Sequence, residues 1–143
     1  MNQPQYTTSL RLPTFAEYKS IFEAVGWADY LNLDVVEQSL KQSLFGVVIQ
    51  HGDETIGMGR VVGDGMIYFY IQDIAVVPAH QNQGIGRQIM DVITDYLKHH
   101  APEKAFIGLF ASQGKEPFYN RYGFNRHDGM TGMFGVIHEG EIK

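Results

Sequence analysis

Residues 71–87 read IQDIAVVPAHQNQGIGR, and this stretch decides the fold. Its first part, residues 71–77, is predicted to be a strand, because its apolar run at 74–77 is of the kind found in a buried strand that is covered on both faces. Pro78 ends this strand, because proline has no N–H group to donate inside a sheet. The residues after the loop show helical periodicity from Arg87 to His100. The stretch therefore predicts a strand, a loop and a helix in direct succession.

The loop before this helix is suited to binding phosphate. Glycines at positions 84 and 86 leave backbone N–H groups uncovered by side chains. These groups point outward at the start of the helix, where the helix dipole is positive and favours anions. A Rossmann dinucleotide site is excluded because Ile89 stands where that motif has glycine or alanine, and because antiparallel strands are predicted before the loop.

The rest of the chain alternates helix and strand signals. Capping boxes that begin at Thr14 and Asp34 predict two short helices, which end near Val25 and Leu44. The strand–helix–strand unit around Arg87–His100 favours parallel strands, so the fold class is α/β, with a sheet that is antiparallel at its start and parallel at its centre. Strands are predicted at residues 7–12, 45–50, 55–62, 66–77, 105–111, 124–126 and 133–137, and a short helix at 116–122.

Size and composition limit the classes of function. A chain of 143 residues is expected to form one domain, residues 1–143. Sixteen acidic residues against 11 basic ones give a net charge of −5, which disfavours nucleic-acid binding. The chain has no cysteine, which excludes disulfides and a cysteine acyl-enzyme, and its histidines show no metal-ligand spacing. Without an 18-residue apolar run or an apolar N-terminal core, a cytoplasmic protein with no membrane contact is expected.

Two motifs resemble those of the GNAT family of acyl-CoA-dependent N-acetyltransferases. Gln81, Gly84 and Gly86 match the family's pyrophosphate loop, Gln/Arg-x-x-Gly-x-Gly/Ala, and residues 117–124, PFYNRYGF, match a later family segment. The resemblance implies the GNAT fold: a single domain with a mixed, mostly antiparallel sheet, a central splayed parallel pair and about four flanking helices. It also implies acetyl-CoA as co-substrate, no metal, and a primary amine of a small molecule as acceptor.

The resemblance assigns the coenzyme to the central strand and to the loop. The pantetheine arm would pair like an added strand with the backbone of Ile74, Ala75 and Val76. A β-bulge near Asp73 would redirect this strand and open the gap. Many relatives hold the arm with an asparagine after the next strand, and Ser112 is the candidate substitute in this chain. The diphosphate is expected at Gln81, Asn82, Gln83, Gly84, Ile85, Gly86 and Arg87.

Two residues are candidates for the chemistry. Tyr119 corresponds to a family tyrosine whose hydroxyl faces the CoA sulfur, where a phenol can protonate the leaving thiolate. Asp73 is a carboxylate in an otherwise apolar strand, which is costly unless it is bonded or functional. It either anchors backbone or an N-terminal loop, or it binds the amine and takes its proton. Both alternatives are open from the sequence.

Aromatic residues are candidates for the acceptor side. Trp27 and Tyr30 lie between the first two predicted helices, and Tyr68 and Tyr70 lie on the long strand. Such rings suit an aryl-alkylamine or another hydrophobic amine, and they equally suit core or dimer contacts. The sequence therefore predicts direct acetyl transfer in a ternary complex. The alternative is a non-catalytic acyl-CoA-binding regulatory module on the same fold. Many relatives dimerise through C-terminal strands, so a homodimer is also open.

Overall fold

A computed structural model describes residues 5–143 and divides the chain into two units. The first unit ends at Leu109 and the second runs from Phe110 to Lys143; each is described by itself. The first unit contains a five-stranded sheet whose strands lie side by side in chain order. These strands are β1 (Tyr6–Ser9), β2 (Phe45–His51), β3 (Glu54–Gly63), β4 (Tyr68–Val76) and β5 (Phe106–Gly108).

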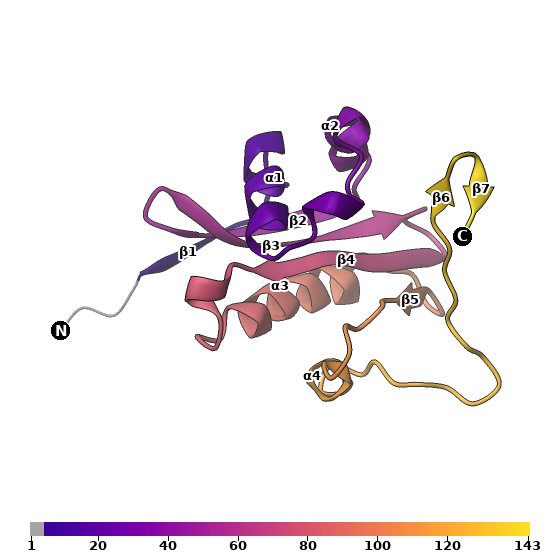
Figure 1. Ribbon diagram of the computed structural model, residues 1–143. Coiled ribbons are helices and arrows are strands. Elements are labelled where there is room, and N and C mark those ends of the chain that lie inside the picture. The colour runs from indigo at the N-terminus through magenta and orange to yellow at the C-terminus, as the bar shows by residue number, and fades with distance from the viewer. Residues whose placement is uncertain (1–4) are drawn as a thin grey trace. The chain divides into compact units, whose positions relative to one another are not determined.

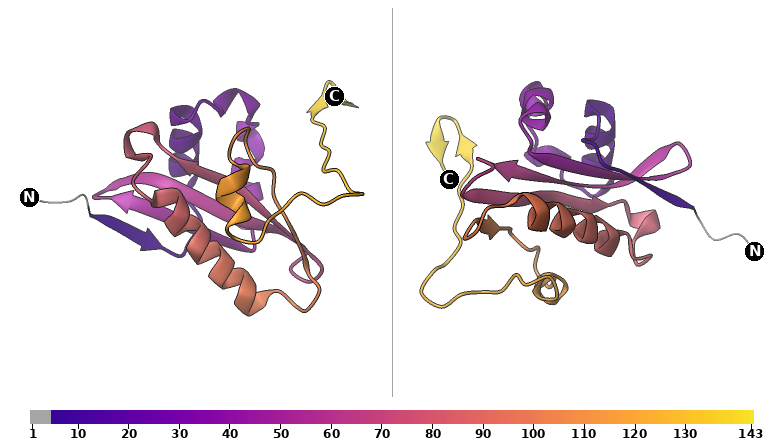
Figure 2. Two further views of the ribbon diagram at one scale, coloured as in Figure 1. Left: turned by 90° about the horizontal axis from the view of Figure 1, so that it is seen from below. Right: turned by 180° about the vertical axis from the view of Figure 1, so that it is seen from behind.

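Helices cover both faces of this sheet. Helices α1 (Phe15–Ala24) and α2 (Val36–Lys41) lie on one face, and α3 (Ile85–His100) lies on the other (Figure 1, Figure 2). Short 3-10 turns occur at Ala28–Tyr30 (η1), Leu33–Val35 (η2) and Pro78–His80 (η3). None of the helices in residues 5–143 combines the length and the apolar character that a membrane crossing needs. Helix α3 buries an apolar stripe against the sheet, formed by Ile85, Ile89, Met90, Ile93 and Leu97.

The β-bulge that the resemblance implied is present in β4. Strands β3 and β4 are antiparallel, with Met58 opposite Ala75 and Arg60 opposite Gln72. Two residues of β4, Asp73 and Ile74, therefore stand opposite the single residue 59 of β3. Asp73 has a φ of 59°, a left-handed backbone conformation that is uncommon for a residue with a side chain. The bulge bends β4 midway along its length.

The parallel pair is splayed, as expected, but it lies at the edge of the sheet. Strands β4 and β5 pair through only three positions, from Tyr68 opposite Phe106 to Tyr70 opposite Gly108. Beyond Tyr70, no strand within residues 5–143 pairs with this side of β4. The expected strand at 105–111 is shorter than predicted, because β5 ends at Gly108. The expected central position is wrong, since β5 is the last strand of the sheet.

The second unit contains helix α4 (Glu116–Asn120) and a two-stranded hairpin, β6 (Ile137–His138) with β7 (Glu141–Ile142). The strands predicted at 124–126 and 133–137 are wrong, apart from residue 137. The hairpin turn explains the difference, because Glu139 and Gly140 both have positive φ, at 51° and 78°. A two-residue turn of this kind fixes which residues pair: Ile137 pairs with Ile142 and His138 with Glu141, and Val136 and Lys143 exchange two backbone hydrogen bonds next to them, each at 2.9 Å.

The first predicted capping box is confirmed and the second is wrong. Thr14 Oγ1 accepts a hydrogen bond from Glu17 N at 3.2 Å, and Glu17 Oε1 accepts one from Thr14 N at 2.8 Å. Asp34 does not cap α2, which begins after Val35 without a side-chain cap. Asn32 Oδ1 accepts from Asp34 N at 3.1 Å instead. The Asx turn at Asn32 therefore begins the 3-10 turn η2, and η2 leads into α2.

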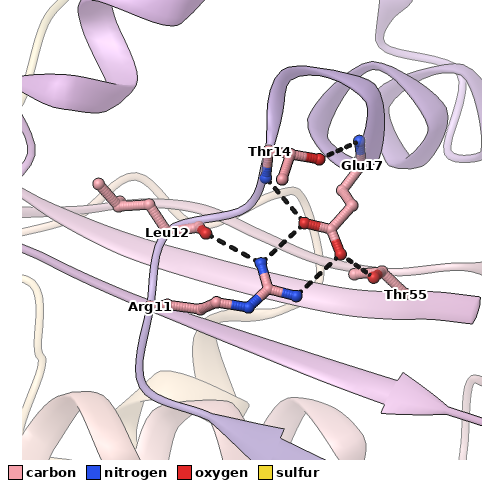
Figure 3. A network of polar contacts seen from close by, with 5 residues as sticks. All are labelled: Arg11, Leu12, Thr14, Glu17 and Thr55. Atoms are coloured by element: carbon pink, nitrogen blue, oxygen red, sulfur yellow. Dashed lines mark hydrogen bonds and ion pairs between the residues drawn. The ribbon is translucent and has the colours of Figure 1, made fainter. Parts of the chain in front are cut away.

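Hydrogen bonds of the Glu17 side chain connect the start of α1 to strand β3 of the sheet. Its carboxylate accepts a forked pair of hydrogen bonds from Arg11, at 2.8 and 3.0 Å, and a further one from the Thr55 hydroxyl of β3 (Figure 3). The Arg11 hydrogen bonds, supported by Thr14 N–H and the Thr55 hydroxyl, lower the pKa of Glu17 to about 2 from its ordinary 4.5. The ionised carboxylate is therefore the form that stabilises this corner of the fold.

Acid is expected to weaken the fold through Glu17. Because the pKa is depressed in the folded chain, the contribution is complete above about pH 4.5 and is lost as the pH falls toward 2. After allowance for solvent screening it amounts to about 1–2 kcal/mol of unfolding free energy. Urea unfolding of the wild type and Glu17→Gln, at about pH 6 and about pH 3, measures it. Equal losses in both proteins would contradict the assignment.

Candidate active site

The loop between β4 and α3 presents the start of a long helix to solvent. Asn82 and Gly84 both adopt left-handed backbone, with φ of 64° and 81°. The first backbone N–H groups of a helix have no hydrogen-bond partner inside the helix. In α3, the hydrogen bond from Gln88 N to the carbonyl oxygen of Gly84, at 3.1 Å, marks where the helical hydrogen bonds begin. A Cβ placed on Gly84 would meet no atom within 4 Å, so the space around it is open. With the helix dipole behind it, this position can hold an anion.

Gln81 holds the loop to the end of β4. Its side-chain Nε2 donates to the carbonyl oxygen of Val76 at 2.9 Å. The neighbouring residue His80 is hydrogen-bonded through Nδ1 to the Tyr6 hydroxyl at 2.8 Å, which ties η3 to β1. The first contact keeps the loop next to β4, the strand that precedes it, and the second fixes it to β1. A direct contact of the Gln81 side chain with phosphate stays a prediction.

The predicted pantetheine residues lie on the splayed part of β4. Ala75 pairs with Met58, and Val76 pairs with Gly57, on the β3 side. On the other side, residues 71–76 have no strand partner within the described chain. Such an edge can accept an extended ligand as an added strand. The arm's predicted path therefore ends beside the open helix start at Gly84.

Asp73 is engaged on the α1 face of the sheet. Its Oδ2 accepts a hydrogen bond from the Tyr18 hydroxyl at 2.8 Å and another from Arg60 Nε at 2.7 Å. Burial, and then the negative charge of Asp73, raise the pKa of Tyr18, so its hydroxyl remains a donor. Both partners are side chains, on α1 and β3, rather than backbone or an N-terminal loop, and the role of Asp73 stays a prediction. Arg60 is a residue that sequence reasoning missed, although a carboxylate inside an apolar strand signals a cationic partner nearby.

Tyr119 and Ser112 lie in the second unit. Tyr119 is half-buried in α4, and its ring meets that of Phe118 edge-on, with centroids 5.0 Å apart. Burial raises the pKa of Tyr119, so the phenol is protonated at neutral pH. Ser112 is exposed, and its carbonyl accepts from Lys115 N at 2.9 Å. The approach of either residue to a coenzyme stays a prediction.

The acceptor candidates fall into two groups. Tyr70 lies on the face of the sheet that α1 and α2 cover. It is two residues from Gln72 and so shares its face, and Gln72 stands opposite Arg60, whose side chain contacts α2. Its ring lies 6.4 Å from that of Phe106, a residue that sequence reasoning did not single out, and Tyr68 is 6.1 Å from the same ring. Trp27 packs edge-on against Phe22. Tyr30 is 86% exposed.

Neither Trp27 nor Tyr30 makes a ring contact with the Tyr68, Tyr70 and Phe106 group among the residues described. Their shared role in one acceptor site therefore stays a prediction. In the part of the chain that the structure covers, His, Asp and Glu side chains form no group of three or more that could hold a metal ion.

Comparisons with known proteins identify the family. A family model described as the acetyltransferase (GNAT) domain matches residues 16–138. An uncharacterised ycf52-like N-acetyltransferase of Prochlorococcus marinus is 32% identical over 127 residues, which cover 84% of this chain and 69% of that protein.

A probable acetyltransferase of unknown function from meticillin-resistant Staphylococcus aureus has a crystal structure that matches with a TM-score of 0.85 and 30% identity, covering 94% of this chain and 100% of that one. A GNAT-family acetyltransferase from Streptococcus pneumoniae matches with a TM-score of 0.76 and 28% identity over 94% of this chain and 100% of its own. The chain described here belongs to the GNAT family of acetyltransferases.

Proposed function

We propose that this protein transfers the acetyl group of acetyl-CoA to a primary amine of a small molecule. The observation that carries the proposal is the edge of β4 at residues 71–76, which no strand within residues 5–143 pairs with and which leads directly to the open helix start at Gly84. The edge suits the amide-bearing pantetheine arm, and the helix start suits its diphosphate. Membership of the GNAT family supports acetyl transfer as the reaction class.

In this proposal the strand and the loop position the co-substrate. Backbone N–H groups around residues 83–87 bind the diphosphate, and the backbone of Ile74, Ala75 and Val76 pairs with the pantetheine arm. A backbone N–H of the same strand would polarise the thioester carbonyl toward attack. Holding both reactants side by side supplies a large part of the rate. Ser112 is the predicted further contact with the arm.

The chemical step is direct attack in a ternary complex, since the chain has no cysteine to carry an acyl intermediate. The neutral amine nitrogen attacks the thioester carbonyl carbon, so a C–N bond forms as the C–S bond breaks. Tyr119 donates its phenolic proton to the leaving thiolate, and the amine's surplus proton passes to water. The tyrosinate is then reprotonated from solvent. The products are an acetamide and CoA.

Binding and turnover test the proposal separately. Calorimetry with CoA measures binding, and a panel of aryl-alkylamines, polyamines, amino acids and peptides, assayed by release of the CoA thiol, measures turnover. We expect binding together with acetylation of at least one small primary amine. Binding of CoA without acetylation of any amine would favour the regulatory acyl-CoA-binding module. Absence of CoA binding would contradict both alternatives. A cytoplasmic location stays a prediction of the sequence.

We also propose that the protein forms a homodimer through its second unit. Large apolar side chains there face solvent, including Met133, which is 85% exposed, and Phe134, which is 81% exposed. Contiguous exposed apolar residues of this kind commonly mark protein interfaces. Sedimentation velocity is expected to show a dimer, and Phe134→Ser is expected to shift the protein toward monomer. A monomeric wild type at micromolar concentration would refute this part of the proposal.

A further inference from the structure

One ion pair joins the bulge of β4 to both helices on the same face of the sheet. Arg60 Nε on β3 lies 2.7 Å from Asp73 Oδ2 on β4, and their side chains are only 11% and 15% exposed. The same carboxylate oxygen accepts from the Tyr18 hydroxyl of α1 at 2.8 Å. The Arg60 guanidinium also lies over the Tyr18 ring, 5.7 Å from its centroid. The bulge and α1 are thus held through a single carboxylate.

The opposite end of the guanidinium holds helix α2. Arg60 Nη1 donates to Ser43 Oγ at 3.0 Å, to Ser39 Oγ at 3.2 Å and to the Ser39 carbonyl at 3.3 Å. Ser39 is in α2, and Ser43 follows its C-terminal end. A planar fork of donors can bind the carboxylate and the serines at once, whereas a lysine ammonium is a single compact charge. Arg60 therefore connects β3, β4, α1 and α2.

The left-handed backbone of Asp73 needs such support. A non-glycine residue at a φ of 59° is strained, and such strain persists only where the surrounding structure holds it. Asp73 is also the residue directly before Ile74, Ala75 and Val76 on the bent half of β4. Any relaxation at Asp73 would thus move the backbone that is proposed to hold the pantetheine arm.

We infer that Arg60 and Asp73 are positioning residues that hold the thioester-binding half of β4 in place relative to helices α1 and α2, which flank the predicted acceptor residues Trp27 and Tyr30. Asp73 acts through the strand backbone, and Arg60 acts through Asp73 and the two serines. Neither acts as acid or base. This inference rests on the proposed function, because it concerns the geometry of the same reaction.

Two variants are expected to differ in which kinetic constant they change. Asp73→Gly keeps a residue that accepts left-handed backbone but removes the carboxylate, so the bulge loses its tie to α1 and to Arg60. We expect kcat to fall about tenfold through misplacement of the thioester. Arg60→Lys keeps a cation beside Asp73 but loses the fork to Ser39 and Ser43. We expect kcat within about threefold of wild type and a KM for the amine raised about tenfold.

Two further variants make the comparison sharper. The double variant with Ser39→Ala and Ser43→Ala removes the same contacts from the other side, so it is expected to reproduce the raised amine KM of Arg60→Lys. Arg11→Met breaks the other arginine–carboxylate pair on α1, which does not involve β4. It is the matched control, and its kinetic constants are expected to equal those of the wild type at a temperature where every variant is folded.

Hydrogen exchange provides a readout that does not depend on activity. The amides of residues 72–76 are expected to exchange faster in Asp73→Gly than in the wild type, and to be unchanged in Arg11→Met. Normal kcat and KM in Asp73→Gly would overturn the inference. So would a loss well beyond a hundredfold together with loss of the acidic limb of the pH–rate profile, because that pattern marks a general base. A wild type that binds no CoA would instead refute the proposed function, whatever the exchange data show.

Discussion

Replacing Tyr119 by phenylalanine is expected to lower kcat about a hundredfold, which is the low end of what a general acid contributes. The change removes one oxygen and keeps the ring that meets Phe118 edge-on, so the fold of α4 is expected to persist. Burial raises the pKa of Tyr119, so the wild-type phenol carries its proton at neutral pH. That proton is what the thiolate of CoA needs as it leaves. Steady-state release of the thiol measures the effect.

The control for this change is Tyr122→Phe, which removes a second phenol from the same motif. The ring of Tyr122 lies 5.7 Å from that of Phe118, so the two tyrosines share an aromatic neighbour. We expect kcat of Tyr122→Phe to stay within about threefold of wild type, and CoA affinity to be the same in both variants. Unchanged turnover in Tyr119→Phe would remove the phenol from the mechanism.

The second large effect is expected at Gly86. A Gly86→Val substitution is expected to weaken CoA binding by at least about tenfold, because a branched side chain in the first turn of α3 would hold the diphosphate away from the backbone N–H groups. The helix itself should not suffer, since valine forms helices more readily than glycine. Calorimetry gives the affinity, and thermal unfolding gives the stability. The expected result is a raised Kd without a lowered Tm.

A ligand control separates this effect from general damage to the site. Acetyl-pantetheine carries the same thioester and arm but lacks the diphosphate and nucleotide. The apparent KM for this substrate is expected to be nearly the same in the wild type and in Gly86→Val. Equal losses with both substrates would show that the side chain disturbs β4 rather than the phosphate position, contrary to the proposed site.

The centre of the fold was predictable because its signals are local. The apolar run at 74–77, Pro78 and the helical periodicity that follows all lie within one segment, and β4 and α3 are found there. The capping box at Thr14 is equally local, because both of its hydrogen bonds span three residues. The resemblance contributed the bulge and the splay, which depend on a register between strands that no single segment contains.

The predictions fail where the local structure depends on a competing neighbour or on a partner that is distant in the sequence. Asp34 has the right residue type and spacing for a helix cap, but Asn32, two residues earlier in the chain, accepts the hydrogen bond of Asp34 N in an Asx turn. Residues 133–137 are apolar enough for a strand, and a strand also needs a partner that the local pattern does not supply. Arg60 was missed for the same reason. Its role follows from its contact with Asp73 on the neighbouring strand, and this contact joins residues that are 13 positions apart in the sequence.

The hydrogen bond from Gln81 to the Val76 carbonyl explains which residues the first position of the family's loop motif admits. That motif has glutamine or arginine there, and both side chains end in N–H groups that can reach a main-chain oxygen. Glutamate has a similar length but offers only acceptors when ionised, so it would face that oxygen without a proton to share. In this structure the motif's opening residue therefore stabilises its own polypeptide, and a direct contact with the coenzyme stays a prediction.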